Sequence, residues 1–168
     1  MDYQIRKAVP GDARALGELH SAAWRKAYKG IVPEEILSRI NPDKREEMFR
    51  QTITSETEDT TVITFRGKVI GFITLGPFRG EESGGPNGEI WGIYISPSHW
   101  HQGLGTTLFN WGVKELTLRG YRQVFLWVLE DNTQARNFYQ KLGFAEDGRT
   151  KEIEMGKTLS VLRYRKQI

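Results

Sequence analysis

The first residues with types and spacing suited to chemistry are two glycines that follow a hydrophobic strand. After a run that ends at Ile95, the chain reads Gly103-Leu104-Gly105 and continues as an amphipathic helix. The first N–H groups of a helix lack partners within it and lie at the positive end of its dipole, so such a turn can hold phosphate oxygens. A turn that only packs a helix on a sheet can need the same glycines. The pattern alone leaves both interpretations open.

Two better-known phosphate motifs do not describe this turn. A dinucleotide-binding turn would have a third glycine or alanine where Leu108 stands, and a P-loop would have Gly-Lys-Ser/Thr at its end. If the turn holds phosphate, it therefore does so within another framework.

A second pair of residues with chemical potential is Asn132 and Tyr139, seven residues apart. Seven residues make about two helical turns, so both side chains project from one face of a helix. Asn132 is also a good N-cap and Gly143 a good residue after a helix end, so each has a structural explanation. Tyr139 borders the apolar stripe of this helix. Its side chain either packs in the core or presents its hydroxyl group to a functional site.

Together, the two segments resemble the GCN5-related N-acetyltransferases, the GNAT family. The family signature is a strand, a proline, an Arg/Gln-x-x-Gly-x-Gly/Ala turn and a helix, and Pro97, Gly103 and Gly105 match it in order and spacing. Its second signature has an Asn at a helix start, a Tyr seven residues later and then Gly-Phe, as found here from Asn132. Trp100 departs from the pattern, because the family has Arg or Gln at that position.

The resemblance implies an acyltransferase that uses acetyl-CoA as cosubstrate and needs no metal. It implies direct attack by a primary amine in a ternary complex, with Tyr139 as general acid, Glu89 as general base and the N–H of Ile95 bonded to the acetyl oxygen. It also implies that the pantetheine arm runs along the strand before the turn. The implied cofactor-binding residues are Ile93, Tyr94, Ile95, Gln102, Gly103, Leu104, Gly105, Thr106, Asn132 and Tyr139.

The absence of cysteine agrees with direct attack, because it removes any acyl-cysteine intermediate. Glu89 has a plainer interpretation as a solvated carboxylate at the start of a strand. His99 and His101 form an H-x-H pair, but no further ligand accompanies them at a suitable spacing, so we expect no metal there.

For the acceptor, the resemblance points to the N-terminal helices. Trp24 and Tyr28 lie four residues apart, one helical turn, in a stretch similar to the Trp-x-x-x-Tyr-x-Gly-Ile-x-Pro of a bacterial subgroup. We expect them to bind the acceptor, although a helix end packed on its neighbour would show the same pattern. The acceptor is expected to be a small-molecule amine or a peptide, with nothing in the residues to select among them.

The elements that must position these residues follow from hydrophobic periodicity and turn signals. The expected fold is of the mixed α/β class and GNAT-like, with a central, mostly antiparallel, twisted sheet of about seven strands and about four flanking helices. Helices are expected at about 12–26, after Pro33, and at 43–53, 103–119 and 133–142. Strands are expected at 3–7, 61–65, 69–75, 89–95, 123–129, 144–155 and 159–165, with a polar, glycine-rich, mobile loop over 80–88.

Composition limits the remaining alternatives. A chain of 168 residues with 38% hydrophobic and 27% charged residues is expected to form one domain, spanning 1–168, with no membrane segment. No secretory signal is seen, so a cytoplasmic location is expected. The net charge of +3 is spread along the chain, which argues against nucleic acid as a partner. A homodimer is compatible with the resemblance, and a CoA-binding sensor without turnover is the main alternative to an enzyme.

Overall fold

Alternating and continuous apolar runs build a single seven-stranded sheet in the computed structural model, which describes residues 2–81 and 85–168. The strand order is β1-β2-β3-β4-β5-β7-β6, and every neighbouring pair is antiparallel except β4 and β5, which are parallel. The strands are β1 (Tyr3–Lys7), β2 (Asp59–Phe65), β3 (Lys68–Pro77), β4 (Asn87–Ile95), β5 (Gln123–Leu129), β6 (Ala145–Glu154) and β7 (Thr158–Gln167).

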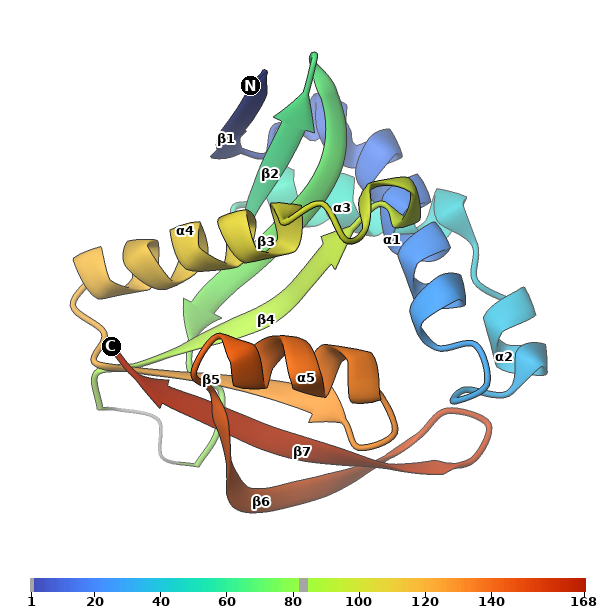
Figure 1. Ribbon diagram of the computed structural model, residues 1–168. Helices are drawn as coiled ribbons and strands as arrows, with labels where there is room; N and C mark the ends of the chain where they lie inside the picture. Colours follow the sequence, from blue (N-terminus) through green and yellow to red (C-terminus); the bar gives the residue numbers. More distant parts are fainter. Residues whose placement is uncertain (1, 82–84) are drawn as a thin grey trace.

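Within the described residues, five α-helices cover the two faces of this sheet. They are α1 (Ala13–Ala27), α2 (Glu34–Ser38), α3 (Pro42–Thr54), α4 (Leu104–Leu118) and α5 (Thr133–Lys141), and short 3-10 turns precede α1 and α4. Figure 1 shows α4 and α5 across one face, with α1 and α3 on the other. The largest hydrophobic cluster lies under α4 and α5, and a second one joins α1 and α3 to β2 and β3.

The predicted fold is confirmed. The helices and strands that were predicted with residue limits agree with the structure to within two residues at each end. The sheet is mixed and mostly antiparallel, as expected. A helix is found at each of the five expected positions, the one after Pro33 being the short α2, so the described residues have five helices where the fold as a whole was expected to have about four. The loop predicted at 80–88 lies two residues earlier, at 78–86, because β3 ends at Pro77 and β4 already begins at Asn87, and residues 82–84 of it lie outside the described residues. In the part of the chain that is described, no helix has the length and apolar character needed to span a membrane.

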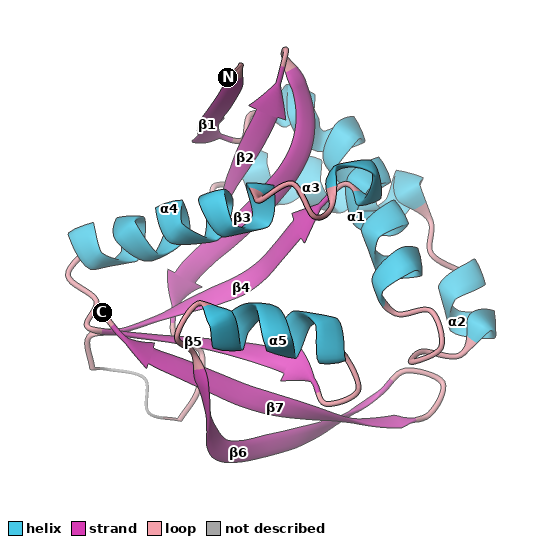
Figure 2. Cartoon of the chain, in the orientation of Figure 1, coloured by secondary structure: helices cyan, strands magenta, loops and turns pink. Residues whose placement is uncertain are grey.

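One irregularity in the sheet has consequences for the site. β3 and β4 pair regularly from Gly71 with Ile95 to Thr74 with Gly92, but the next pair is Leu75 with Ile90, so Trp91 is left without a partner. Such a bulge bends the strand and increases its twist. β4 therefore turns away from β5 soon after the two strands meet, as Figure 2 shows.

Candidate active site

The site begins where β4 and β5 separate. Their parallel pairing covers only residues 87–89 with 123–125, although β4 continues to Ile95 and β5 to Leu129. Ser96 donates its N–H to the Ile70 carbonyl at 2.8 Å, and the groups of successive residues in an antiparallel pair alternate in direction. The backbone groups of Ile93 and Ile95 therefore face the gap rather than β3. An extended, amide-containing ligand can pair with them as an additional strand would.

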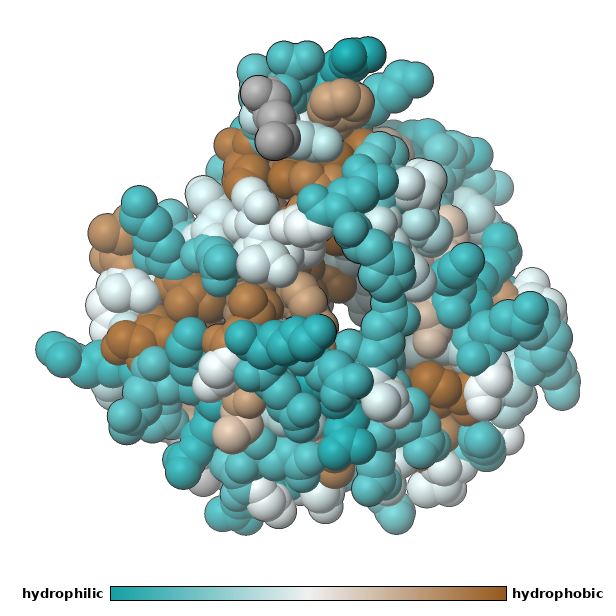
Figure 3. Space-filling view, viewed as in Figure 1, coloured by the Kyte–Doolittle hydropathy of each residue, from teal (hydrophilic) through white to brown (hydrophobic). Residues whose placement is uncertain are grey.

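A cavity of ≈ 700 Å³ occupies this gap. It extends from the turn before α4 past β4, β5 and α5 to α1 and the β6–β7 hairpin, and Figure 3 shows the surface hollowed between these elements. Most of the predicted site residues line it, and these are Trp24, Tyr28, Ile93, Tyr94, Ile95, Gly103, Gly105, Thr106, Asn132 and Tyr139. The structure does not bring Glu89, Gln102 or Leu104 to its wall.

The turn before α4 has the geometry of an anion seat. Gly103 is the N-cap and has φ 77°, a left-handed conformation that favours glycine, while Thr107 donates the first helical N–H back to its carbonyl at 3.0 Å. The N–H groups of residues 104–106 precede that bond and remain free for a ligand. A Cβ added at Gly105 would lie 3.5 Å from the Phe138 ring and 3.8 Å from Ile95, inside the gap between α5 and β4.

Two residues of this turn, Gln102 and Leu104, do not line the cavity. Leu104 is only 5% exposed and anchors the helix start in the core, while the Gln102 side chain is exposed and donates to the Ser98 carbonyl at 3.3 Å. Their side chains therefore shape the turn and do not face the cavity.

Trp100 ties the turn to the end of β4. Its indole N–H donates to the Ile95 carbonyl at 2.7 Å, and the Lys26 ammonium lies 5.9 Å from its ring centre. The indole thus occupies one of the backbone acceptors that face the gap, while the N–H of Ile95 stays available.

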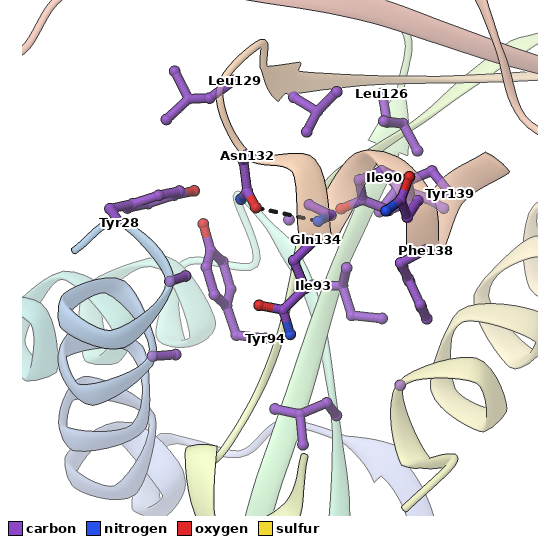
Figure 4. Close-up of a pocket in the computed structure, with 18 of the residues that line it drawn as sticks. Tyr28, Ile90, Ile93, Tyr94, Leu126, Leu129, Asn132, Gln134, Phe138 and Tyr139 are labelled. Atoms are coloured by element: carbon purple, nitrogen blue, oxygen red, sulfur yellow. Dashed lines mark hydrogen bonds between the residues drawn. The ribbon is translucent and has the colours of Figure 1, made fainter. Parts of the chain in front are cut away.

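Asn132 and Tyr139 lie on the side of α5 that faces the cavity (Figure 4). The Asn132 carboxamide oxygen accepts the N–H of Ala135 at 3.1 Å, so this residue is the predicted N-cap while its amide group remains at the wall. Tyr139 packs against Phe109 and Phe138, and no described residue bonds to its hydroxyl. Burial raises the pKa of Tyr139 above its ordinary value, so the hydroxyl keeps its proton at neutral pH.

The N-terminal wall is aromatic. Trp24 donates its indole N–H to the Tyr94 hydroxyl at 3.1 Å, and its ring meets Tyr28 edge-on at 4.7 Å. The hydroxyls of Tyr28 and Tyr94 point toward one another in Figure 4. Burial raises the pKa of both, so the wall carries no phenolate. The structure thus joins the two predicted acceptor residues to the strand that lines the gap.

The geometry does not support the predicted role of Glu89 as general base. Its side chain is 2% exposed, it lies outside the cavity wall, and both oxygens are engaged by Arg79. The Arg79 guanidinium donates at 2.8 Å and its backbone N–H at 3.0 Å. Because both carboxylate oxygens accept bonds from Arg79 and the side chain lies outside the cavity wall, Glu89 is not placed to take a proton from an amine in the cavity.

Sequence reasoning missed several residues that the fold brings to the site. Trp91 and Trp127 line the cavity from β4 and β5, and Phe138 lines it from α5. Behind the wall, His20 is packed among the rings of Trp24 and Tyr94 and lies 3.0 Å from an Arg45 nitrogen. The bulge at Trp91 has no local sequence signal, whereas the alternation along β5 could have indicated which face Trp127 occupies. Among the described residues no group of three His, Cys, Asp or Glu could hold a metal.

Comparisons with known proteins agree with this geometry. The acetyltransferase (GNAT) family matches residues 15–144. An uncharacterized N-acetyltransferase of Bacillus subtilis, YuaI, is 29% identical and covers 90% of this chain and 91% of its own. A spermidine N(1)-acetyltransferase of Thermoplasma acidophilum is 27% identical, covering 86% and 89%. The solved structure of PaiA N-acetyltransferase from Thermoplasma acidophilum with coenzyme A has a TM-score of 0.77 at 23% identity, covering 100% of both chains.

Proposed function

The chain belongs to the acetyltransferase (GNAT) family and is an acetyl-CoA-dependent acyltransferase, and we propose that it acetylates a primary amine by direct attack within a ternary complex. The observation that carries this proposal is the gap between β4 and β5, which opens beside a helix start without a side-chain cap and is lined by Tyr139. The alternative of a sensor without turnover is not supported, because the similar proteins are named N-acetyltransferases.

The residues around the gap fit acetyl-CoA. In this proposal, the N–H groups of residues 103–106 and the exposed Gln102 backbone hold the pyrophosphate. The outward N–H and carbonyl of Ile93, next to Tyr94, hold the amide-rich arm, the N–H of Ile95 is left for its acetyl end, and Asn132 offers its amide from the opposite wall. Leu104 contributes through its backbone N–H, since its side chain belongs to the core.

When bound, the cosubstrate supplies an activated thioester, and the protein supplies position and a proton. The acceptor nitrogen attacks the thioester carbon and loses a proton to water as the amide bond forms. The carbon–sulfur bond breaks, and the Tyr139 hydroxyl gives its proton to the departing sulfur and regains one from water. The raised pKa of Tyr139 keeps that proton in place until a thiolate develops. The N–H of Ile95 points into the gap, where it can donate to the acetyl oxygen.

The acceptor must arrive as a neutral amine, and the cavity favours this form without a fixed base. Burial beside Trp24, Tyr28 and Tyr94 disfavours the ammonium, because an apolar wall desolvates its charge. The ammonium proton then passes to water at the open side of the cavity. Nothing in this step requires Glu89, whose role in the proposal is to hold the Arg79 segment beside β4.

Release of the CoA thiol from acetyl-CoA in the presence of different primary amines tests the proposal. We expect release that depends on the amine, and a Tyr139→Phe variant that loses at least about a hundredfold in kcat while it retains acetyl-CoA affinity. Tyr121→Phe is a matched control, because Tyr121 packs on the same core but does not line the cavity. Amine-independent thiol release would overturn the transferase proposal, and an unchanged Tyr139→Phe rate would overturn its assignment as acid.

A further inference from the structure

The part of the cavity lined by aromatic side chains of α1, β4 and β5 has an unusual composition. Four of the five tryptophans of the chain line the cavity, and three of these lie in this part, here named the acceptor half. No Asp or Glu lines the cavity among the described residues. The acceptor half is bounded by Trp24, Tyr28, Trp91, Tyr94, Trp127 and Met155.

Each tryptophan of the acceptor half carries a cation of the protein over its ring. The distances from cation to ring centre are 4.9 Å for Arg45 and Trp24, 4.1 Å for Arg79 and Trp91, and 4.1 Å for Lys151 and Trp127. Arg79 is neutralised by Glu89, whereas Arg45 and Lys151 form no ion pair within the described part of the chain. The acceptor half is therefore a nonpolar, aromatic space with positive charge behind its walls.

This arrangement suits one class of acceptor. The large, flat rings offer stacking and apolar contact to an aromatic or aliphatic body. A second ammonium on the acceptor would find no carboxylate there, would be desolvated, and would be repelled by Arg45 and Lys151. One face of each indole already faces a cation, so these rings attract a further cation less than free ones would.

On the basis of the function proposed above, we propose that the acceptor is a primary monoamine on an aromatic or aliphatic apolar body, and that diamines and polyamines are rejected. The single amine nitrogen reaches the gap beside Tyr139, and its body fills the space between Tyr28 and Trp127. The positive walls also promote loss of the ammonium proton, since they disfavour the charged form of the amine.

Substrate pairs that differ by one charge test this inference. We expect kcat/KM for hexylamine to exceed that for 1,6-diaminohexane by about tenfold or more, and phenethylamine to exceed spermidine by at least as much. Equal or better use of the diamine or of spermidine would overturn the proposed acceptor class while leaving amine acetylation intact.

A variant pair tests the cause. Met155 lies in the β6–β7 turn, is partly exposed and lines the acceptor half, so Met155→Glu places a carboxylate there with little disturbance of the strands. We expect Met155→Glu to raise the ratio of diamine to monoamine turnover several-fold, while the isosteric Met155→Gln does not. The same ratio in both variants would refute the electrostatic argument.

Equilibrium binding separates this inference from the proposed reaction. Because the acceptor half contains three of the five tryptophans, acceptor binding in the presence of CoA is expected to change the indole fluorescence. Hexylamine that binds at least about tenfold more tightly than 1,6-diaminohexane supports the inference even if no acetyl transfer is observed. Tighter binding of the diamine overturns the inference whatever the rate of transfer.

Discussion

Replacing Gly105 with alanine separates the folding of the α4 turn from its proposed binding of acetyl-CoA. Gly105 is the second residue of α4 and, unlike Gly103, has no left-handed φ. An added methyl group meets no protein atom closer than 3.5 Å, so the variant folds without a clash. The same methyl group lies in the gap between Phe138 and Ile95, where the turn presents its N–H groups.

The two effects have opposite signs. Alanine in place of glycine within a helix adds up to about 0.5–1 kcal/mol to stability, which raises Tm by roughly 1–4 °C for a chain of this size. A methyl group at contact distance keeps a phosphate or amide oxygen from reaching the roughly 2.9 Å that an N–H···O bond needs. Loss of one bond to a charged group costs about 1.5–3 kcal/mol, so CoA affinity is expected to fall about 10- to 100-fold.

Calorimetric titration with CoA and thermal unfolding of the same preparation measure both effects. Gly11→Ala is the matched control, because Gly11 also has open space for a Cβ but lies outside the cavity wall. CoA affinity equal in Gly105→Ala, Gly11→Ala and the unmodified chain would refute the assignment of the turn to the cosubstrate. A Tm of Gly105→Ala below that of the unmodified chain would show instead that the added methyl group strains the turn.

Three further changes test the roles assigned around the site. Glu89→Gln is expected to lower the free energy of unfolding by about 1–3 kcal/mol through its buried contact with Arg79, with kcat of the folded enzyme unchanged; a lowered kcat with normal stability would restore the role of base. Burial, with the charge of Arg45, lowers the pKa of His20 to about 3. The unfolded chain then binds the extra proton between about pH 6.5 and pH 3, so stability is complete above this window and falls by up to about 1.4 kcal/mol per pH unit below pH 6.5. His20→Phe should flatten that slope in acid unfolding curves. Trp100→Phe removes the bond to the Ile95 carbonyl and should cost about 1 kcal/mol in chemical unfolding, and an unchanged stability would mean that the bond contributes nothing.

Much of the framework could be predicted from local sequence signals. The hydrophobic period and the turn signals located the strands and helices to within two residues, because most elements have a buried or half-buried face that sets their pattern. The N-cap role of Asn132 and the glycine turn at Gly103 also follow from local rules of helix ends. These features depend on residues that are close in sequence, so they can be predicted from one sequence alone.

The position of Glu89 could not be predicted in this way. Its place at the start of a strand is the same whether its carboxylate faces a cavity or an arginine, and Arg79 lies ten residues earlier across a loop. The bulge at Trp91 is equally hidden, because it depends on the register that β3 imposes on β4. The burial of a carboxylate thus follows from the pairing of two strands rather than from its own sequence context.

The acceptor half is the part of the site that depends most on tertiary structure. Arg45 of α3 stands over Trp24 of α1, and Lys151 of β6 stands over Trp127 of β5, so each pair joins separate elements. The sequence shows an even spread of basic residues, and only the fold gathers some of them behind one cavity. The end proposed to bind the cosubstrate could be predicted from local rules of helix ends, because a pyrophosphate needs backbone donors. The end proposed to bind the acceptor depends on tertiary packing, because its apolar walls and the charges behind them are built by residues far apart in the chain.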